Sequence, residues 1–230
     1  MCLIKTQLVT TCHQLNSLLI RRKFEMYLPE KFSENENEKI KKVIEQNPLA
    51  TVLSFSESCK PFINHLPVVF NSNELEEKIL IGHMSKHNPQ WSHFKTNSEC
   101  TMIINGASTY ITPEWYKSGR DVPTWNYAVV HLYGKMELVE SFKEQIEILK
   151  KQTAFFEKKQ LRPWAFSLPD DLVDESALTS AIVSFRFHIE KVEAKFKLSQ
   201  NRSKEDQLGI IAGLSERTDD MSKKVREMML

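Results

Sequence analysis

Cysteine is scarce in this sequence, and its four cysteines stand far apart. Cys2, Cys12, Cys59 and Cys100 form no C-x-x-C pair. A zinc ribbon needs such pairs, and a small disulfide-stabilised secreted domain needs a dense cysteine framework, so both classes are excluded. The pattern is typical of a protein that works in the reducing cytoplasm.

Long apolar runs and concentrated charge are also missing. No apolar run reaches the roughly 18 residues of a membrane-spanning helix. The formal net charge is +1, and no arginine-rich run occurs. Nucleic-acid-binding arms carry clustered positive charge, so the charge distribution gives no support to direct DNA contact. With 6 Gly and 9 Pro, the 230 residues are not of low complexity and can bury a sizeable core.

Three common catalytic motifs do not occur. Without a Walker A sequence or a G-x-G-x-x-G, neither a P-loop nor a Rossmann pocket is indicated. Without G-x-S-x-G there is no nucleophile elbow of a serine hydrolase. His83 and His87 are close in sequence, but we expect His83 at a strand end and His87 before a helix. They therefore do not share a helical face as zinc-hydrolase ligands do, and we predict no metal site.

The first 25 residues differ from the rest of the chain. Residues 1–24 contain no acidic side chain, and the cluster Arg21, Arg22 and Lys23 follows the apolar residues. A signal peptide has the opposite order, whereas a transit peptide is compatible with this composition. A start at Met26 is a simpler explanation. We predict residues 1–25 as a dispensable extension, 26–214 as one domain and 215–230 as a C-terminal helix.

Hydrophobic periodicity predicts strands that follow one another without regular crossover helices. The predicted strands cover residues 49–55, 61–70, 78–83, 99–104, 108–112, 127–139 and 181–197. The predicted helices cover residues 36–46, 141–159, 170–180, 204–212 and 216–229, with a short one from Asn88 through Phe94. This order argues against a doubly wound sheet. It favours a mainly β chain with helices (α+β), built as an antiparallel barrel with helices at its edges.

The segment from Val122 to Gly134 combines aromatic, histidine and asparagine side chains where a loop enters a strand. Alternation places Tyr127, Val129, His131 and Tyr133 on one face, and Ala128, Val130, Leu132 and Gly134 on the other. Neither face is charged, so we expect a core on one face and a partner or ligand on the other. Flat aromatic surface with hydrogen-bonding groups suits a planar ligand such as a flavin or nucleobase. The simpler alternative is an aromatic core strand.

A cation, a hydroxyl and a helix start come together after the third predicted strand. Asn88 is a good N-cap, and Pro89 stands at the favoured first helical position. Ser85, Lys86 and His87 arrive just upstream. Because a helix N-terminus offers unpaired N–H groups and the positive end of the dipole, this composition is typical of a phosphate site. The alternative is a solvated turn with ordinary capping.

A second polar group follows the last predicted strand. Lys195 and Lys197 precede the run Ser199-Gln200-Asn201-Arg202. The amide of Gln200 both donates and accepts, as the edge of a flavin or pyrimidine ring requires. Arg202 offers a fork that suits phosphate or carboxylate. Capping of the next helix by Ser203 or Asn201 is the simpler alternative, and it accounts for one residue but not for the whole run.

Several segments together carry a family resemblance. From Met26 to about Leu214 the chain resembles the FMN-binding negative transcriptional regulators of the PaiB family. The segments that carry it are Met26–Pro29, His65–Pro67, Gly82–Trp91, Tyr110–Tyr116, Val122–Tyr127, Lys197–Arg202 and Ile211–Leu214. They occur in order and leave out the first 25 residues.

The resemblance implies a split β-barrel, similar to the pyridoxamine-phosphate-oxidase-like flavoproteins, in which FMN lies between the two chains of a homodimer. It implies that Ser85, Lys86 and Asn88 hold the FMN phosphate, together with Arg202. Segment position places the remaining candidates around the flavin ring: Thr51, His65, Leu66, Trp125, Asn126 and Gln200.

Three functions follow as hypotheses. The resemblance favours a regulatory flavoprotein with FMN as a structural or sensing ligand. The barrel type also accommodates an FMN-dependent oxidoreductase or flavin reductase, for which His65 and His131 are the best acid–base candidates. The third is a non-enzymatic module for another phosphorylated planar ligand. No residue is identified as an obligatory catalytic group.

Overall fold

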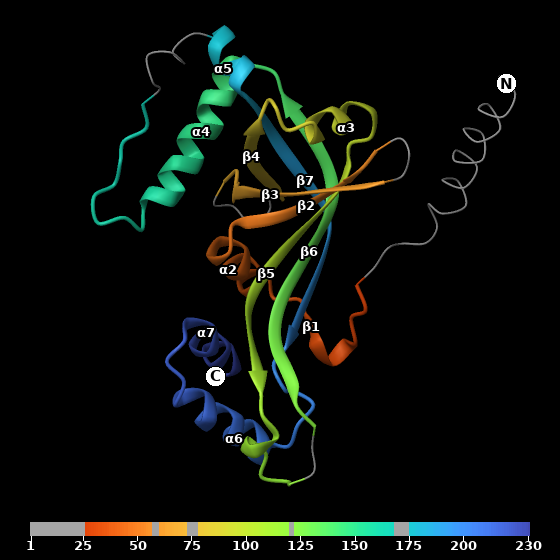
Figure 1. Cartoon of the computed structure of the whole chain (residues 1–230), viewed down its shortest axis with the longest axis vertical. Coiled ribbons are helices and arrows are strands. Elements are labelled where there is room, and N and C mark those ends of the chain that lie inside the picture. The colour runs from red at the N-terminus through yellow and green to blue at the C-terminus, as the bar shows by residue number, and fades with distance from the viewer. Residues whose placement is uncertain (1–25, 57–59, 73–77, 120–121, 168–174) are drawn as a thin grey trace, which may run out of the picture.

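A computed structural model describes residues 26–56, 60–72, 78–119, 122–167 and 175–230. Its centre is one antiparallel sheet with the strand order β1-β7-β4-β3-β2-β5-β6 (Figure 1). β6 also pairs with β7, so the six longer strands close into a barrel. The strands are β1 Ser33–Glu34, β2 Leu49–Phe55, β3 Pro61–Phe70, β4 Ile79–Ser85, β5 Glu99–Ile111, β6 Thr124–Val139 and β7 Ile182–Lys197.

Helices lie around the barrel and at the two ends of its long strands. The helices are η1 Glu30–Phe32, α2 Asn37–Gln46, α3 Gln90–Thr96, η2 Pro113–Trp115, α4 Phe142–Glu157, α5 Glu175–Ala181, α6 Lys204–Ser215 and α7 Asp220–Met229. In Figure 1, α3, α4 and α5 lie near the top, and α6 and α7 lie at the bottom. Residues 170–174 of the predicted helix 170–180 lie outside the described ranges, and α5 covers its second half.

The core occupies the inner face of the barrel. The predicted alternation in β6 is confirmed, because Ala128, Val130 and Leu132 are buried and pack with the other strands. The helices α2, α3 and α7 add Val43, Phe94 and Val225 to the same cluster. A second, smaller cluster lies beneath α4 and consists of Val69, Ile81, Val139 and Ile148.

The predicted pair of strands at 99–104 and 108–112 is one strand, β5, which is an error of the sequence prediction. The pairing of β5 with β6 shifts between Asn105 and Ser108, so a bulge replaces the expected break. Gly106 stands in this bulge, where an added Cβ would lie 3.0 Å from the carbonyl oxygen of Ala128 and 3.2 Å from Val43. Gly106 marks a close approach of backbone and α2 within a continuous strand, rather than a strand end.

The outer face of the barrel carries a row of directly opposed residues. His65, Thr51, Ile103, His131 and Glu193 are successive partners across β3, β2, β5, β6 and β7. Together with the same-face neighbours along these strands, we call this surface the open face. α2, α3 and α7 pack on the inner core, and α4 packs on β3 and β4. In the part of the chain that the structure describes, no helix covers this row. His65, Thr51, Ile103 and His131 are exposed or part-exposed, whereas Glu193 is buried and accepts the backbone N–H of Met26. The open face is therefore available to a ligand or a partner on its β3 to β6 side, and the segment that begins at Met26 lies against its β7 side.

Candidate functional site

Ser85 and Lys86 form a corner at the end of β4. Ser85 pairs with Ile182, and the backbone N–H of Lys86 donates to the carbonyl of Ala181. The indole N–H of Trp91 donates to the Lys86 carbonyl at 2.9 Å, and the Lys86 ammonium lies 4.4 Å from the centre of the same indole ring. Trp91 thus contacts both the backbone carbonyl and the ammonium group of the exposed Lys86. These two contacts keep the positive charge at a defined place.

Asn88 precedes helix α3, whose N-cap is Pro89, so the helix begins one residue later than the sequence predicts. The side-chain oxygen of Asn88 accepts the backbone N–H of Gln90 at 3.0 Å and the amide of Asn64 at 3.1 Å. This uses one of the helix's unpaired donors, and α3 spans only 7 residues. A dipole from so short a helix contributes little. The ammonium of Lys86 is therefore the main electrostatic attraction that this corner offers to an anion.

The sequence prediction gave no role to Gln90, which holds α3 against the β2–β3 hairpin. Its fully buried amide donates to the carbonyls of Val52 and Phe62 and to the hydroxyl of Ser54, and its oxygen accepts from Asn64. All polar atoms of the side chain are engaged, so the contact is specific. The only signal in the sequence was its place in the segment Gly82–Trp91.

Thr51 and His65 meet on the open face. The hydroxyl of Thr51 lies 3.1 Å from Nδ1 of His65, across the β2–β3 pair. The side chain of Leu66 is buried and points into the core instead. Of these three predicted ring contacts, Thr51 and His65 present side chains where a planar ligand could lie. Leu66 could reach such a ligand only through its backbone.

Trp125 and Asn126 lie on opposite faces at the far end of β6. Trp125 is 54% exposed and meets Tyr110 edge to face, with ring centres 6.2 Å apart. Asn126 is fully buried, and its amide contacts the hydroxyl of Ser199 and the sulfur of Met229. Asn126 therefore holds the turn after β7 in place, and Trp125 offers the exposed aromatic surface.

The turn after β7 is tight and internally bonded. Ser199 has φ 64°, which is uncommon for a residue other than glycine. The side chain of Gln200 accepts from the N–H of Leu198 and donates to the carbonyl of Phe196, so its amide serves its own turn. The guanidinium of Arg202 lies 4.7 Å from the ring centre of Tyr116. Gln200 is exposed but uses its amide within the turn, whereas the part-exposed Arg202 lies with its guanidinium over Tyr116.

The predicted phosphate site at Ser85 and Lys86 and the polar run that contains Gln200 and Arg202 lie at opposite ends of β7. Ser85 pairs with the first residue of that strand, whereas Gln200 and Arg202 follow its last residue. Sixteen residues at about 3.3 Å each make roughly 50 Å of strand. Within one chain, Arg202 therefore does not lie beside Ser85 and Lys86. Tyr127 pairs with Lys197, so Trp125, two residues earlier on β6, is likewise at the Arg202 end. In Figure 1 this end of β6 and β7 lies near α6.

An ionisable network occupies the middle of the open face. The hydroxyl of Tyr133 donates to Glu193 at 3.0 Å and lies 3.4 Å from His131. Burial would raise the pKa of Glu193, but hydrogen bonds from Lys191, Met26 and Tyr133 outweigh it and lower that pKa. Burial and the bond to Glu193 raise the pKa of Tyr133 to about 12. Burial lowers the pKa of His131, against the opposing charge of Glu193. The lowered pKa favours the uncharged imidazole at neutral pH.

The lowered pKa of His131 predicts a loss of stability on acidification. The unfolded chain takes up a proton near pH 6.5 while the folded chain resists it, so stability falls as pH drops through 6.5. The loss ends once the pH is below the pKa of the folded state. We expect His131→Gln to flatten the fall in thermal midpoint between pH 7 and pH 5. His87→Gln, at an exposed position, is the control, and equal pH profiles for wild type and His131→Gln would refute the assignment.

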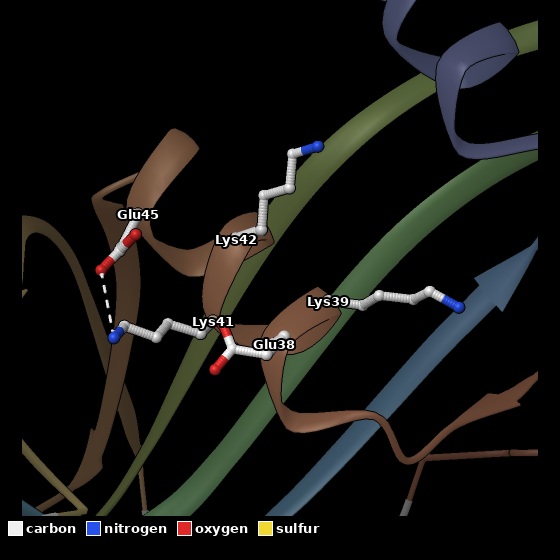
Figure 2. Close-up of a pocket in the computed structure, with 5 residues that line it drawn as sticks. All are labelled: Glu38, Lys39, Lys41, Lys42 and Glu45. Carbon is white, nitrogen blue, oxygen red and sulfur yellow. Dashed lines mark ion pairs between the residues drawn. The ribbon is translucent and has the colours of Figure 1, made fainter. Parts of the chain in front are cut away.

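The hollow along α2 offers no convergent ligand groups. It is lined by Glu38, Lys39, Lys41, Lys42 and Glu45. Lys41 pairs with Glu45 at 4.0 Å, and the charged ends of the other three side chains point in different directions (Figure 2). This surface has the character of a solvated helix face.

The histidines near α3 point to different elements. Nδ1 of His83 lies 2.7 Å from Gln152 on α4, whereas Nδ1 of His93 lies 3.1 Å from Ser54 on β2. Within the described ranges, no three His, Cys, Asp or Glu side chains are placed to share a metal ion. In the same ranges no helix is both long and apolar enough to cross a bilayer.

Comparison with known proteins agrees with these features. Residues 26–191 match the family described as "Putative FMN-binding domain". The protein named "Protease synthase and sporulation protein PAI 2" of Bacillus subtilis (strain 168) is 32% identical over 206 residues, which cover 89% of this chain and 96% of the relative.

Two solved structures show the same fold at low identity. A FAD and heme binding protein from Mycobacterium smegmatis has a TM-score of 0.57 at 13% identity, over 76% of this chain and 78% of that one. A flavocytochrome from Azotobacter vinelandii has a TM-score of 0.56 at 16% identity, over 82% of this chain and 79% of that one. The predicted mainly β split barrel is confirmed.

Proposed function

This chain belongs to the FMN-binding domain family, and we propose that two copies of it hold FMN between them and act as a regulator of the PaiB type. FMN is the cofactor that the family carries. A shared site is proposed because the length of β7 separates Ser85 and Lys86 from Arg202. One chain cannot bring both groups to one ligand, whereas a second copy can supply the missing group.

The residues at the corner of β4 fit the phosphate of FMN. Ser85 offers a hydroxyl, and Lys86 offers an ammonium that Trp91 holds in place. Thr51 and His65 offer hydrogen-bonding groups on the flat open face, where the ring would lie. When bound, FMN supplies a redox-active ring, and the chain supplies binding and orientation.

The open face has the composition of an interface between two copies. Its rim exposes the large apolar side chains of Leu49, Phe55 and Ile63, which lie on the neighbouring strands β2 and β3. Exposed apolar surface of this kind marks interaction sites. A two-fold axis perpendicular to the long strands would place the Trp125 and Arg202 end of one copy near the Lys86 end of the other, because it reverses the direction of these strands in the second copy.

Solution mass and absorbance test the shared site together. We expect a yellow preparation with FMN in a dimer and one FMN per chain. FMN bound at full occupancy to a monomer would contradict a site made by two copies. A colourless protein that binds another phosphorylated planar compound would instead support a different ligand.

The regulatory part of the proposal rests on the relative from Bacillus subtilis, whose name connects that protein with protease synthesis and sporulation. The formal net charge of +1 gives no electrostatic support to direct DNA contact. We therefore propose regulation through the FMN-bound state of the protein. Gel-shift titrations over a range of salt concentrations test direct repression, which requires a preference for one DNA sequence over others.

An FMN-dependent oxidoreductase is the alternative, and the neutral His131 on the open face is the observation that favours it. A neutral imidazole can accept a proton near a bound flavin. In that case, NAD(P)H oxidation by the FMN-loaded protein must exceed the rate of free FMN. A rate equal to that of free FMN would remove the alternative.

We further propose that residues 26–214 form the FMN-binding domain without residues 1–25. The backbone N–H of Met26 donates to Glu193 at 2.8 Å, so the described chain is already anchored to β7 at its first residue. We expect deletion of residues 1–25 to leave the thermal midpoint and the solution mass unchanged. A large loss of either would show that the extension is part of the folded unit.

A further inference from the structure

Three cations gather where β7 ends. Lys195 and Lys197 lie on the open face, two residues apart on β7, and Arg202 follows in the turn after the strand. Burial lowers the pKa of Lys197 most, and the charges of Arg202 and Lys195 lower it further, so the three groups lie close enough to repel one another. Like charges held together cost folding free energy, which makes such clusters candidates for a functional site.

Neutral groups hold the two lysines in place. The ammonium of Lys197 donates to the hydroxyl of Thr124 and, at 2.8 Å, to the carbonyl of Trp125. The ammonium of Lys195 donates to the carbonyl of Tyr27 at 2.9 Å and lies near the rings of Tyr27 and Tyr127. These contacts orient both ammonium groups without neutralising them. In the described ranges, no carboxylate forms an ion pair with either lysine.

The nearest carboxylate along β7 is engaged with other groups. Glu193 is the carboxylate two residues before Lys195, and it pairs with Lys191 at 2.7 Å and accepts from Met26 and Tyr133. Arg202 is also positioned, because its guanidinium stacks on the ring of Tyr116. The positive charge at the end of β7 is therefore arranged in advance, which reduces the cost of binding an anion.

The surface beside the cations is aromatic. Trp125 and Tyr110 are partners across β5 and β6, both are exposed, and their rings meet edge to face. The carbonyl of Trp125 is the acceptor of Lys197, so the indole and the ammonium belong to the same corner. An exposed aromatic surface next to fixed cations suits a planar molecule that carries a negative group.

We propose that Lys195, Lys197 and Arg202 form an anion-binding site, at the opposite end of β7 from the Ser85 and Lys86 corner of the same chain, for the phosphate or carboxylate of a planar ligand that lies against Trp125. Lys197 and Arg202 are part-exposed and make the contacts, and the buried Lys195 contributes its charge. The anion has two sources: FMN bound mainly by a second copy, or a separate anionic ligand. The first source rests on the proposed function, and the second does not.

The test compares Lys197→Met with Lys191→Met, which removes a lysine from the same face of β7 where Glu193 already pairs with it. FMN and riboflavin affinities are measured by flavin fluorescence, and inorganic phosphate is titrated while the thermal midpoint is followed. If FMN of a second copy is the source, Lys197→Met weakens FMN binding roughly ten- to a hundredfold, and Lys197→Arg restores most of it. Lys191→Met then binds FMN like wild type.

If a separate ligand is the source, FMN affinity stays constant in Lys197→Met. Inorganic phosphate then raises the thermal midpoint of the FMN-loaded wild type and of Lys191→Met, but not of Lys197→Met. If the chain binds no FMN, the same phosphate titration on the flavin-free protein still tests the anion site. Failure of the FMN proposal can therefore be told apart from failure of the anion-site proposal. A Lys197→Met protein that matches wild type in both FMN affinity and phosphate response overturns the inference. Unfolding of both Lys197→Met and Arg202→Met also overturns it, because the cations would then serve the fold.

Discussion

Lys86→Ala is expected to weaken FMN binding roughly ten- to a hundredfold while leaving the thermal midpoint of the flavin-free protein unchanged. A charge-assisted hydrogen bond to phosphate contributes about 1.5–3 kcal/mol. The Lys86 side chain is exposed, and the bond from the Trp91 indole goes to the Lys86 backbone, which alanine retains. The substitution therefore removes the ammonium and little of the local structure. Fluorescence titration with FMN measures the change.

Two comparisons make this result specific to the phosphate. Lys95→Ala removes the other ammonium that lies over Trp91, at 4.9 Å from the ring centre, and should leave FMN affinity within about threefold of wild type. Riboflavin lacks the phosphate, so its affinity should be the same for wild type and Lys86→Ala. Equal loss of riboflavin and FMN binding would place Lys86 at the ring, and no loss of either would place the site elsewhere.

Gly134→Ala is expected to destabilise the barrel by about 3 kcal/mol. A Cβ on Gly134 would lie 2.0 Å from the carbonyl oxygen of His188 and 3.2 Å from the backbone nitrogen of Glu190. Both contacts are with backbone at the place where the β6–β7 register shifts, so no side-chain rotation relieves them. For a domain of this size, the thermal midpoint should fall by roughly 6–12 °C.

Lys135→Ala provides the matched control one residue further along β6. Its side chain is exposed and its ion pair with Glu190 is at the surface, so its removal should cost less than about 1 kcal/mol. Thermal unfolding of the two variants and wild type separates the effects. A Gly134→Ala midpoint within 2 °C of that of Lys135→Ala would contradict the close packing of β6 on β7.

Local features of the fold were predictable because they depend on neighbours in sequence. The bounds of β2 and β3 agree with the prediction, since both strands have clear alternation and turn residues at their ends. The bond from the N–H of Gln90 to the side chain of Asn88 was predictable from residue type, although the helix begins one residue later than predicted. The bulge at Gly106 was not predictable, because it depends on contacts with Ala128 and Val43 from other elements.

The arrangement of the candidate site depends on distant pairings. Residue type suggested Asn126 and Gln200 as ring contacts, but the structure places Asn126 in the interior and engages the amide of Gln200 within its own turn. The register of β7 with β4 puts Lys86 and Arg202 at opposite ends of the molecule. No local pattern encodes that register, which is why both groups could be proposed from sequence but their separation could not.

Complementation between two variants tests the shared site most directly. Lys86→Ala and Arg202→Ala are each expected to bind FMN weakly, at both sites of their dimers. When the two chains are unfolded and refolded together, a mixed dimer has one site with both substitutions and one site with neither. We predict that titration of the mixed sample recovers high-affinity FMN binding at one site per mixed dimer. A mixed sample that forms dimers but recovers no high-affinity binding would show that each FMN is held by one chain.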